Sequence, residues 1–98
     1  MAVIVNVILR GVSPGQYDAV RAETGHVDRP PDGGLLHVVW WEGDDCHIID
    51  AWESEAAFNA FGADRLGPAM AAVGATVEPE VTFHAAHEVL APQSVELT

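Results

Sequence analysis

An aspartate within an apolar run is the residue of this sequence that most clearly suggests chemistry. Asp50 lies in "CHIIDAW", and the chain has four arginines and no lysine to neutralise it. A buried carboxylate needs a hydrogen-bonding or charged partner. The preceding apolar run, "LLHVVWW", contains His37. A carboxylate beside a histidine fixes the tautomer of the imidazole and raises its basicity, which is the arrangement of a general base.

The turn between the two runs predicts that these side chains are neighbours. Gly43-Asp44 suits a two-residue hairpin turn. Counting outward from that turn places His37 opposite Asp50, and cross-strand partners point to the same face about 5 Å apart at Cβ. Trp52 would then lie diagonal to His37 on that face. The sequence therefore predicts a hydrogen-bonded pair of His37 and Asp50.

Three interpretations of this pair remain open. It could act as a catalytic base, or it could only fix the register of the two strands. A slipped register would separate the two side chains, because a shift of one residue moves a side chain to the other face of the sheet.

Two further polar residues are candidates for hydrogen bonds to a substrate oxyanion. Asn6 interrupts the apolar first strand, and Tyr17 lies on the first predicted helix. Each could equally satisfy a partner within the core, since buried polar groups are hydrogen-bonded. His84 and His87, in "HAAH", would point to opposite faces of a strand. We therefore expect no metal site.

The elements that must position these residues follow in the order β-α-β-β-α-β. Ser13 and Ser54 are N-cap residues, Gly25 ends the first helix, and Gly67-Pro68 breaks the second. Strands are expected over residues 2–10, 35–41, 46–52 and 80–90, helices over 14–24, 54–66 and 69–73, and a loop over 26–34. This order predicts an α+β, ferredoxin-like fold with a four-stranded antiparallel sheet and both helices on one face. We assign residues 1–90 to this domain and 91–98 to a C-terminal tail, a candidate arm for a partner.

The expected sheet is apolar on both faces. In the first strand Val5 and Val7 occupy one face, and Ile4 and Ile8 occupy the other. Helices cover one face, and a second copy of the sheet is the simplest cover for the other. A 98-residue chain with 49% hydrophobic residues is therefore expected to form a homodimer.

Composition excludes several classes of partner. The formal net charge of -11 argues against nucleic acid and against an anionic membrane surface, which both attract clustered Lys and Arg. The apolar start lacks a basic leader region and is too short to span a bilayer, so a cytoplasmic protein is expected. Cys46 is the single cysteine, which rules out an internal disulfide.

The stretch "DAWESEAAFNAFGADRLGPAM", between a strand hairpin and a last strand, resembles the dimeric α/β-barrel superfamily. Across residues 2–90 the chain is most similar to the antibiotic-biosynthesis-monooxygenase (ABM) group. The resemblance implies a dimeric α/β barrel with a pocket between sheet and helices, lined by Trp52, Phe58 and Phe61. Asn6 resembles the strand-one asparagine of the haem-degrading members.

The resemblance also implies an activity. The expectation is a small cofactor-independent monooxygenase that acts on an aromatic or polyketide-like small molecule, using a base and oxygen but no metal or flavin. Haem-degrading relatives place a histidine near the position of Met70 and Ala71, where this chain has none, so no haem is expected. A non-oxidative cyclase or isomerase, or a non-catalytic small-molecule-binding dimer, remain the alternatives.

Overall fold

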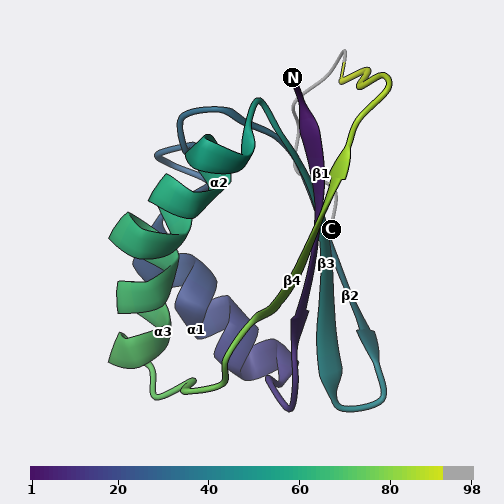
Figure 1. Ribbon diagram of the computed structural model, residues 1–98. Coiled ribbons are helices and arrows are strands. Elements are labelled where there is room, and N and C mark those ends of the chain that lie inside the picture. The colour runs from purple at the N-terminus through teal and green to yellow at the C-terminus, as the bar shows by residue number, and fades with distance from the viewer. Residues whose placement is uncertain (92–98) are drawn as a thin grey trace.

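A four-stranded antiparallel sheet, with strand order β2-β3-β1-β4, forms one layer of the protein. The computed structural model describes residues 1–91. The helices form a second layer on one side of the sheet (Figure 1). The elements in chain order are β1 (Val3–Leu9), α1 (Pro14–Thr24), β2 (Gly34–Glu42), β3 (Asp45–Trp52), α2 (Glu55–Phe61), the π-helical turn η1 (Gly62–Leu66), α3 (Gly67–Ala72) and β4 (Glu80–Ala85). This confirms the predicted α+β ferredoxin-like fold.

The first helix begins and ends at the predicted residues. The hydroxyl of Ser13 accepts a hydrogen bond from the backbone N–H of Gln16, whose side chain accepts one from the Ser13 N–H. This reciprocal capping box satisfies two N–H groups that would otherwise lack partners. Gly25 ends the helix with a left-handed φ of 62°, a conformation that glycine adopts without a Cβ clash.

The second helical region does not break at Gly67-Pro68, so the predicted break is wrong. The backbone of Gly67 is right-handed helical, with φ -57° and ψ -52°, and its N–H bonds to the Gly62 carbonyl. Proline disfavours the helical region for the preceding residue partly through that residue's Cβ, which glycine lacks. The wider π-turn of η1 also removes the usual α-helical hydrogen-bond pattern just before the proline ring. Helix therefore continues from α2 into α3.

The β2–β3 hairpin has the predicted register. Gly43 has a positive φ of 60° in the turn, Trp41 pairs with Cys46, and His37 pairs with Asp50. A register shift between Gly34 and Leu36 lies on the far side of His37 from the turn. The pairing that positions the candidate site is therefore set by the turn.

The last strand is shorter than predicted. It ends at Ala85, which pairs with Val3, the first residue of β1. One further hydrogen bond joins the Ala86 N–H to the Ala2 carbonyl. Beyond that point β1 offers no partner, so the predicted extension to residue 90 is wrong. Of the predicted tail, only Ala91 lies within the described residues.

Side chains on the inner face of the sheet form the core with the helices. Buried apolar residues include Val5, Val7, Leu9, Cys46, Ile48 and Trp52 from the sheet, together with Val12, Val20, Phe58, Ala69, Met70 and Ala75. The outer face is also apolar and carries exposed Leu36 (49%), Val38 (46%), Trp40 (37%) and Ile49 (36%). Both faces are thus apolar, as expected from the sequence.

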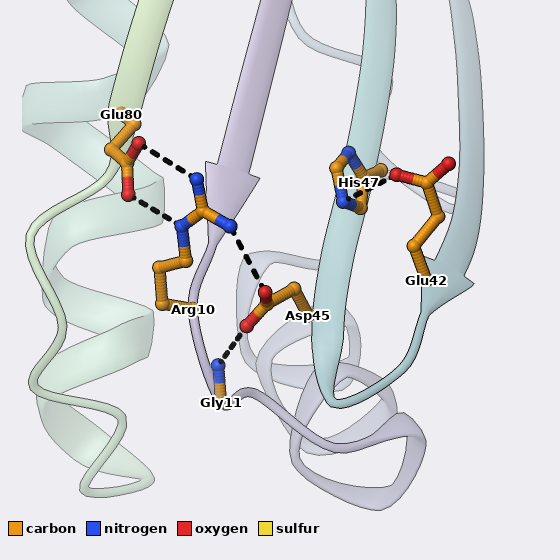
Figure 2. A network of polar contacts seen from close by, with 6 residues as sticks. All are labelled: Arg10, Gly11, Glu42, Asp45, His47 and Glu80. Atoms are coloured by element: carbon orange, nitrogen blue, oxygen red, sulfur yellow. Dashed lines mark hydrogen bonds and ion pairs between the residues drawn. The ribbon is translucent and has the colours of Figure 1, made fainter.

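A polar network crosses the hairpin end of the sheet (Figure 2). The guanidinium of Arg10 contacts Asp45 on β3 at 3.0 Å and Glu80 on β4 at 2.8 Å. A hydrogen bond from the Gly11 N–H, and then Arg10 itself, lower the pKa of Asp45. Nε2 of His47 lies 3.0 Å from a carboxylate oxygen of Glu42, and this contact joins β2 and β3. The network links all four strands at the rim of the apolar outer face.

Candidate active site

The predicted pair of His37 and Asp50 is present and closely hydrogen-bonded. Nδ1 of His37 lies 2.6 Å from Oδ1 of Asp50. The aspartate side chain is 8% exposed, whereas the histidine side chain is 37% exposed. Asp50 therefore lies in the interior, and the imidazole extends from it toward the surface. The slipped register is excluded. The side chains around the pair bear on whether it is catalytic or only structural.

The second oxygen of Asp50 also has a partner. The indole N–H of Trp52 donates to Oδ2 at 3.0 Å. With both carboxylate oxygens accepting, Nδ1 of His37 carries the hydrogen, and the neutral ring keeps a lone pair on Nε2. Trp52 is buried, with 3% of its surface exposed. It thus fixes the orientation of the carboxylate that in turn orients the imidazole.

Tyr17 lies at the other nitrogen of the imidazole. Its hydroxyl is 2.7 Å from Nε2 of His37. Burial raises the pKa of Tyr17 to about 12, so the hydroxyl keeps its proton at neutral pH and donates to Nε2. The tyrosine ring also stacks on the imidazole of His37, with the ring centroids 6.2 Å apart. It meets the indole of Trp41 edge-on, at 5.7 Å between centroids. A continuous relay therefore runs from Trp52 through Asp50 and His37 to Tyr17, and His37 is its most exposed member, since Tyr17 is partly buried.

His26 is a neighbour that sequence reasoning missed. Its ring centroid is 5.1 Å from that of His37, at an interplanar angle of 65°. Its Nδ1 lies 2.9 Å from the hydroxyl of Thr24. Burial, and then the nearby His37, lower the pKa of His26 to about 4. The loop after α1 thus brings a neutral imidazole beside His37, the most exposed member of the relay.

The predicted aromatic residues form a wall behind Trp52. Phe58 meets its indole edge-on at 5.7 Å, and Phe61 packs against it at 5.5 Å. Phe58 also lines a cavity of about 500 Å³ between β1, β4 and the α2–α3 region, with Val7, Leu66, Met70 and Val81. Neither His37 nor Asp50 lines that cavity. Trp52 and Phe61, which were also expected to line the pocket, do not line this cavity. Phe58 therefore contacts both the cavity and the indole that bonds to Asp50.

Asn6 does not join this site. Its backbone pairs with Ile49 on β3, whereas its neighbour Val5 pairs with Asp50. Because successive side chains of a strand alternate, Asn6 shares the outer face with the exposed Ile49. The expectation that Asn6 helps to form the same pocket as His37 is corrected accordingly.

Among the described residues 1–91, no group of three or more His, Cys, Asp and Glu side chains is arranged to hold a metal ion. Burial raises the pKa of Cys46 to about 11, which leaves its thiol protonated and a poor nucleophile. Within the same range, no helix combines the length and the apolar character that crossing a membrane requires.

Known proteins similar to this chain are found by comparing structures, and none is found by comparing sequences. No protein-family model and no curated protein sequence matches the chain. A protein of unknown function from Nitrosomonas europaea, NE2512, superposes with a TM-score of 0.71 at 15% identity, over 95% of this chain and 96% of its own. SnoaB from Streptomyces nogalater, a cofactor-independent oxygenase, gives 0.63 at 22% identity, over 94% and 97%.

A third similar structure is that of a monooxygenase from the gene ActVA-Orf6 of Streptomyces coelicolor, in complex with nanaomycin D. It gives a TM-score of 0.61 at 24% identity, over 93% of this chain and 92% of that chain. At these identities the likeness concerns the fold. The resemblance to ABM proteins drawn from the sequence is confirmed at that level.

Proposed function

We propose that the protein is a small cofactor-independent oxygenase that deprotonates a hydroxylated aromatic or polyketide-like molecule with the His37–Asp50 pair. One observation carries the proposal: the hydrogen-bonded relay from buried Asp50 through His37 to Tyr17. A pair that served only to fix strand register would need no further partner at Nε2. Here the phenolic hydroxyl of Tyr17 meets that nitrogen, on the side of the imidazole that faces away from the buried carboxylate.

The relay provides a path for one proton. The Tyr17 hydroxyl gives its proton to Nε2 of His37 as it takes one from the substrate. The imidazolium that forms is stabilised by the adjacent carboxylate of Asp50, which two donors hold in place. General bases of this kind contribute about 10²–10⁴-fold to the rate. Tyr17 returns to its neutral state, consistent with its raised pKa.

Oxygen would complete the reaction without a bound cofactor. Deprotonation of an anthrone gives an electron-rich carbanion, which can transfer electrons to oxygen. Overall, the CH₂ group and O₂ become a ketone and water, so atoms and electrons balance. The structural neighbours support this reaction class, because SnoaB is a cofactor-independent oxygenase and the ActVA-Orf6 protein is a monooxygenase with nanaomycin D bound.

Oxygen uptake with a simple anthrone tests the proposal. We expect the protein to consume one O₂ per anthrone above the uncatalysed rate and to give the anthraquinone. Conversion of a candidate substrate under nitrogen would favour a cyclase or isomerase instead. Tight binding without turnover in either atmosphere would favour a non-catalytic binding protein.

We also propose that the protein is a homodimer formed through the outer face of the sheet. Leu36, Val38 and Trp40 from β2 and Ile49 from β3 expose a contiguous apolar surface there. Monomeric proteins seldom leave large apolar patches in water. A second copy offers an equally apolar surface, and the charged network at the hairpin end would lie at the rim of such an interface.

A further inference from the structure

We propose that His26 accepts a hydrogen bond from a hydroxyl group of the aromatic ligand and thereby selects hydroxylated rings over their methyl ethers. This inference rests on the proposed function and names the feature of the substrate that the site would recognise. It follows from the tautomer of His26, the accessibility of its second nitrogen and its place beside His37.

Thr24 determines the tautomer of His26. The Thr24 hydroxyl donates its single hydrogen to the Arg21 carbonyl at 3.0 Å. Its oxygen can therefore only accept from Nδ1 of His26, 2.9 Å away. Nδ1 carries the hydrogen, and Nε2 of the neutral ring presents a lone pair.

That lone pair is open to a ligand. Within residues 1–91, the hydrogen bond found for the His26 side chain is the one to Thr24. Every buried side-chain nitrogen or oxygen in this part of the chain has a hydrogen-bond partner. Because Nε2 of His26 has none, it must reach solvent. A ligand hydroxyl can therefore approach it next to His37.

His26 suits the role of an acceptor rather than that of a base. Its pKa of about 4 keeps the ring neutral at neutral pH and makes it a weak proton acceptor. The carboxylate of Asp50 can stabilise an imidazolium at His37. The partner of His26 is the uncharged hydroxyl of Thr24. The two rings thus have different roles. His26 accepts a hydrogen bond from one O–H group of the ligand, and His37 receives, through Tyr17, the proton that the ligand loses.

A matched pair of probes tests this inference. We expect 2-naphthol to bind about three- to tenfold more tightly than 2-methoxynaphthalene, on the scale of one hydrogen bond. His26→Phe should abolish the preference, His26→Gln should retain part of it through its amide oxygen, and His87→Phe, at an exposed histidine outside the site, should leave it intact. A preference that persists in His26→Phe, or wild-type protein that binds both probes equally, overturns the inference.

Two readouts separate this inference from the proposed function. Nitrogen-15 NMR of the wild-type protein should show hydrogen on Nδ1 of His26 without any ligand, and hydrogen on Nε2 would refute the geometry. If neither probe binds, the aromatic-ligand function fails together with the inference. If oxygen uptake with the anthrone is normal but the probe preference is absent, only the role of His26 fails.

Discussion

The indole N–H of Trp52 donates to Oδ2 of Asp50 at 3.0 Å, on the oxygen that His37 does not use. This contact makes the buried carboxylate a fixed double acceptor. It also explains why an aspartate is tolerated on the buried inner face of the sheet, since each carboxylate oxygen has a hydrogen-bond donor. The packing of Trp52 against Phe58 and Phe61 is therefore part of the candidate site, although those two rings lie away from His37.

Asp50→Asn should invert the tautomer of His37. An amide offers one acceptor and one donor where the carboxylate offers two acceptors. Because Trp52 can only donate, the amide oxygen should face the indole, and the amide N–H should face Nδ1 of His37. The ring hydrogen then moves to Nε2, which nitrogen-15 NMR detects. Asp44→Asn, in the exposed turn, is the control and should leave the tautomer unchanged.

The same substitution should lower the free energy of unfolding by about 1–3 kcal/mol, the usual cost of disturbing a buried hydrogen-bonded group. Denaturant titration of the Asp50→Asn and Asp44→Asn variants measures the difference. An unchanged tautomer together with unchanged stability would show that the relay is not formed as described.

Tyr17 should titrate at unusually high pH. Burial raises its pKa to about 12, against an ordinary value near 10. It is the single tyrosine of the chain, so ultraviolet absorbance of the phenolate reports on this residue alone. We expect the absorbance to rise around pH 12 while circular dichroism still shows folded protein. A midpoint near 10 in the folded protein would place the hydroxyl in open solvent.

Stability should fall as the pH drops from about 6.5 to about 4, partly because of His26. Its pKa is lowered to about 4 in the folded protein, so in this window the unfolded chain binds a proton that the folded chain does not. Burial is the main cause, and the charged and titratable groups His37, Arg21, Asp50 and Arg65 also act on it.

Melting temperatures measured from pH 7 to pH 4 test this dependence. His26→Gln should flatten the curve, because glutamine does not titrate, whereas His87→Gln should not. A wild-type curve with the same slope as the His26→Gln variant would mean that His26 is not shielded from protonation.

Dimerisation should depend on the outer face of the sheet. Light scattering of the wild-type protein at micromolar concentration should give about twice the chain mass of 10.4 kDa. Val38→Glu should shift the mass to that of a monomer by placing a charge within the apolar surface. Val27→Glu is a matched control, because Val27 is similarly exposed, 49% against 46%, but lies in the loop after α1. Dissociation by both variants, or by neither, would place the interface elsewhere.

The hairpin made the His37–Asp50 pair predictable from sequence. A two-residue turn at Gly43-Asp44 leaves one register, and counting from it determines which side chains are opposite. Asn6 could not be placed by the same count. Its face relative to Asp50 depends on the pairing of β1 with β3, in which Val5 is opposite Asp50, and no hairpin turn joins these two strands.

His26 could not be predicted in this way. It follows Gly25, whose left-handed backbone redirects the chain after α1, and a loop has no periodicity from which to infer a face. Its contact with His37 depends on tertiary packing alone. The π-turn before Pro68 was also not predictable. Proline disfavours a helical conformation at the residue before it, yet Gly67 is helical because the π-turn lets the helix continue through Pro68.

The turnover of Asp50→Asn relative to Asp44→Asn tests the central claim most directly. Both changes remove one carboxylate, and only the first reaches the relay. With an anthrone as substrate and oxygen uptake as the signal, we predict that Asp50→Asn lowers kcat at least about tenfold, while the protein stays folded and Asp44→Asn matches the wild type. A general base contributes about 10²–10⁴-fold, and this substitution removes the partner of the base rather than the base itself. A folded Asp50→Asn variant with wild-type kcat would contradict the account.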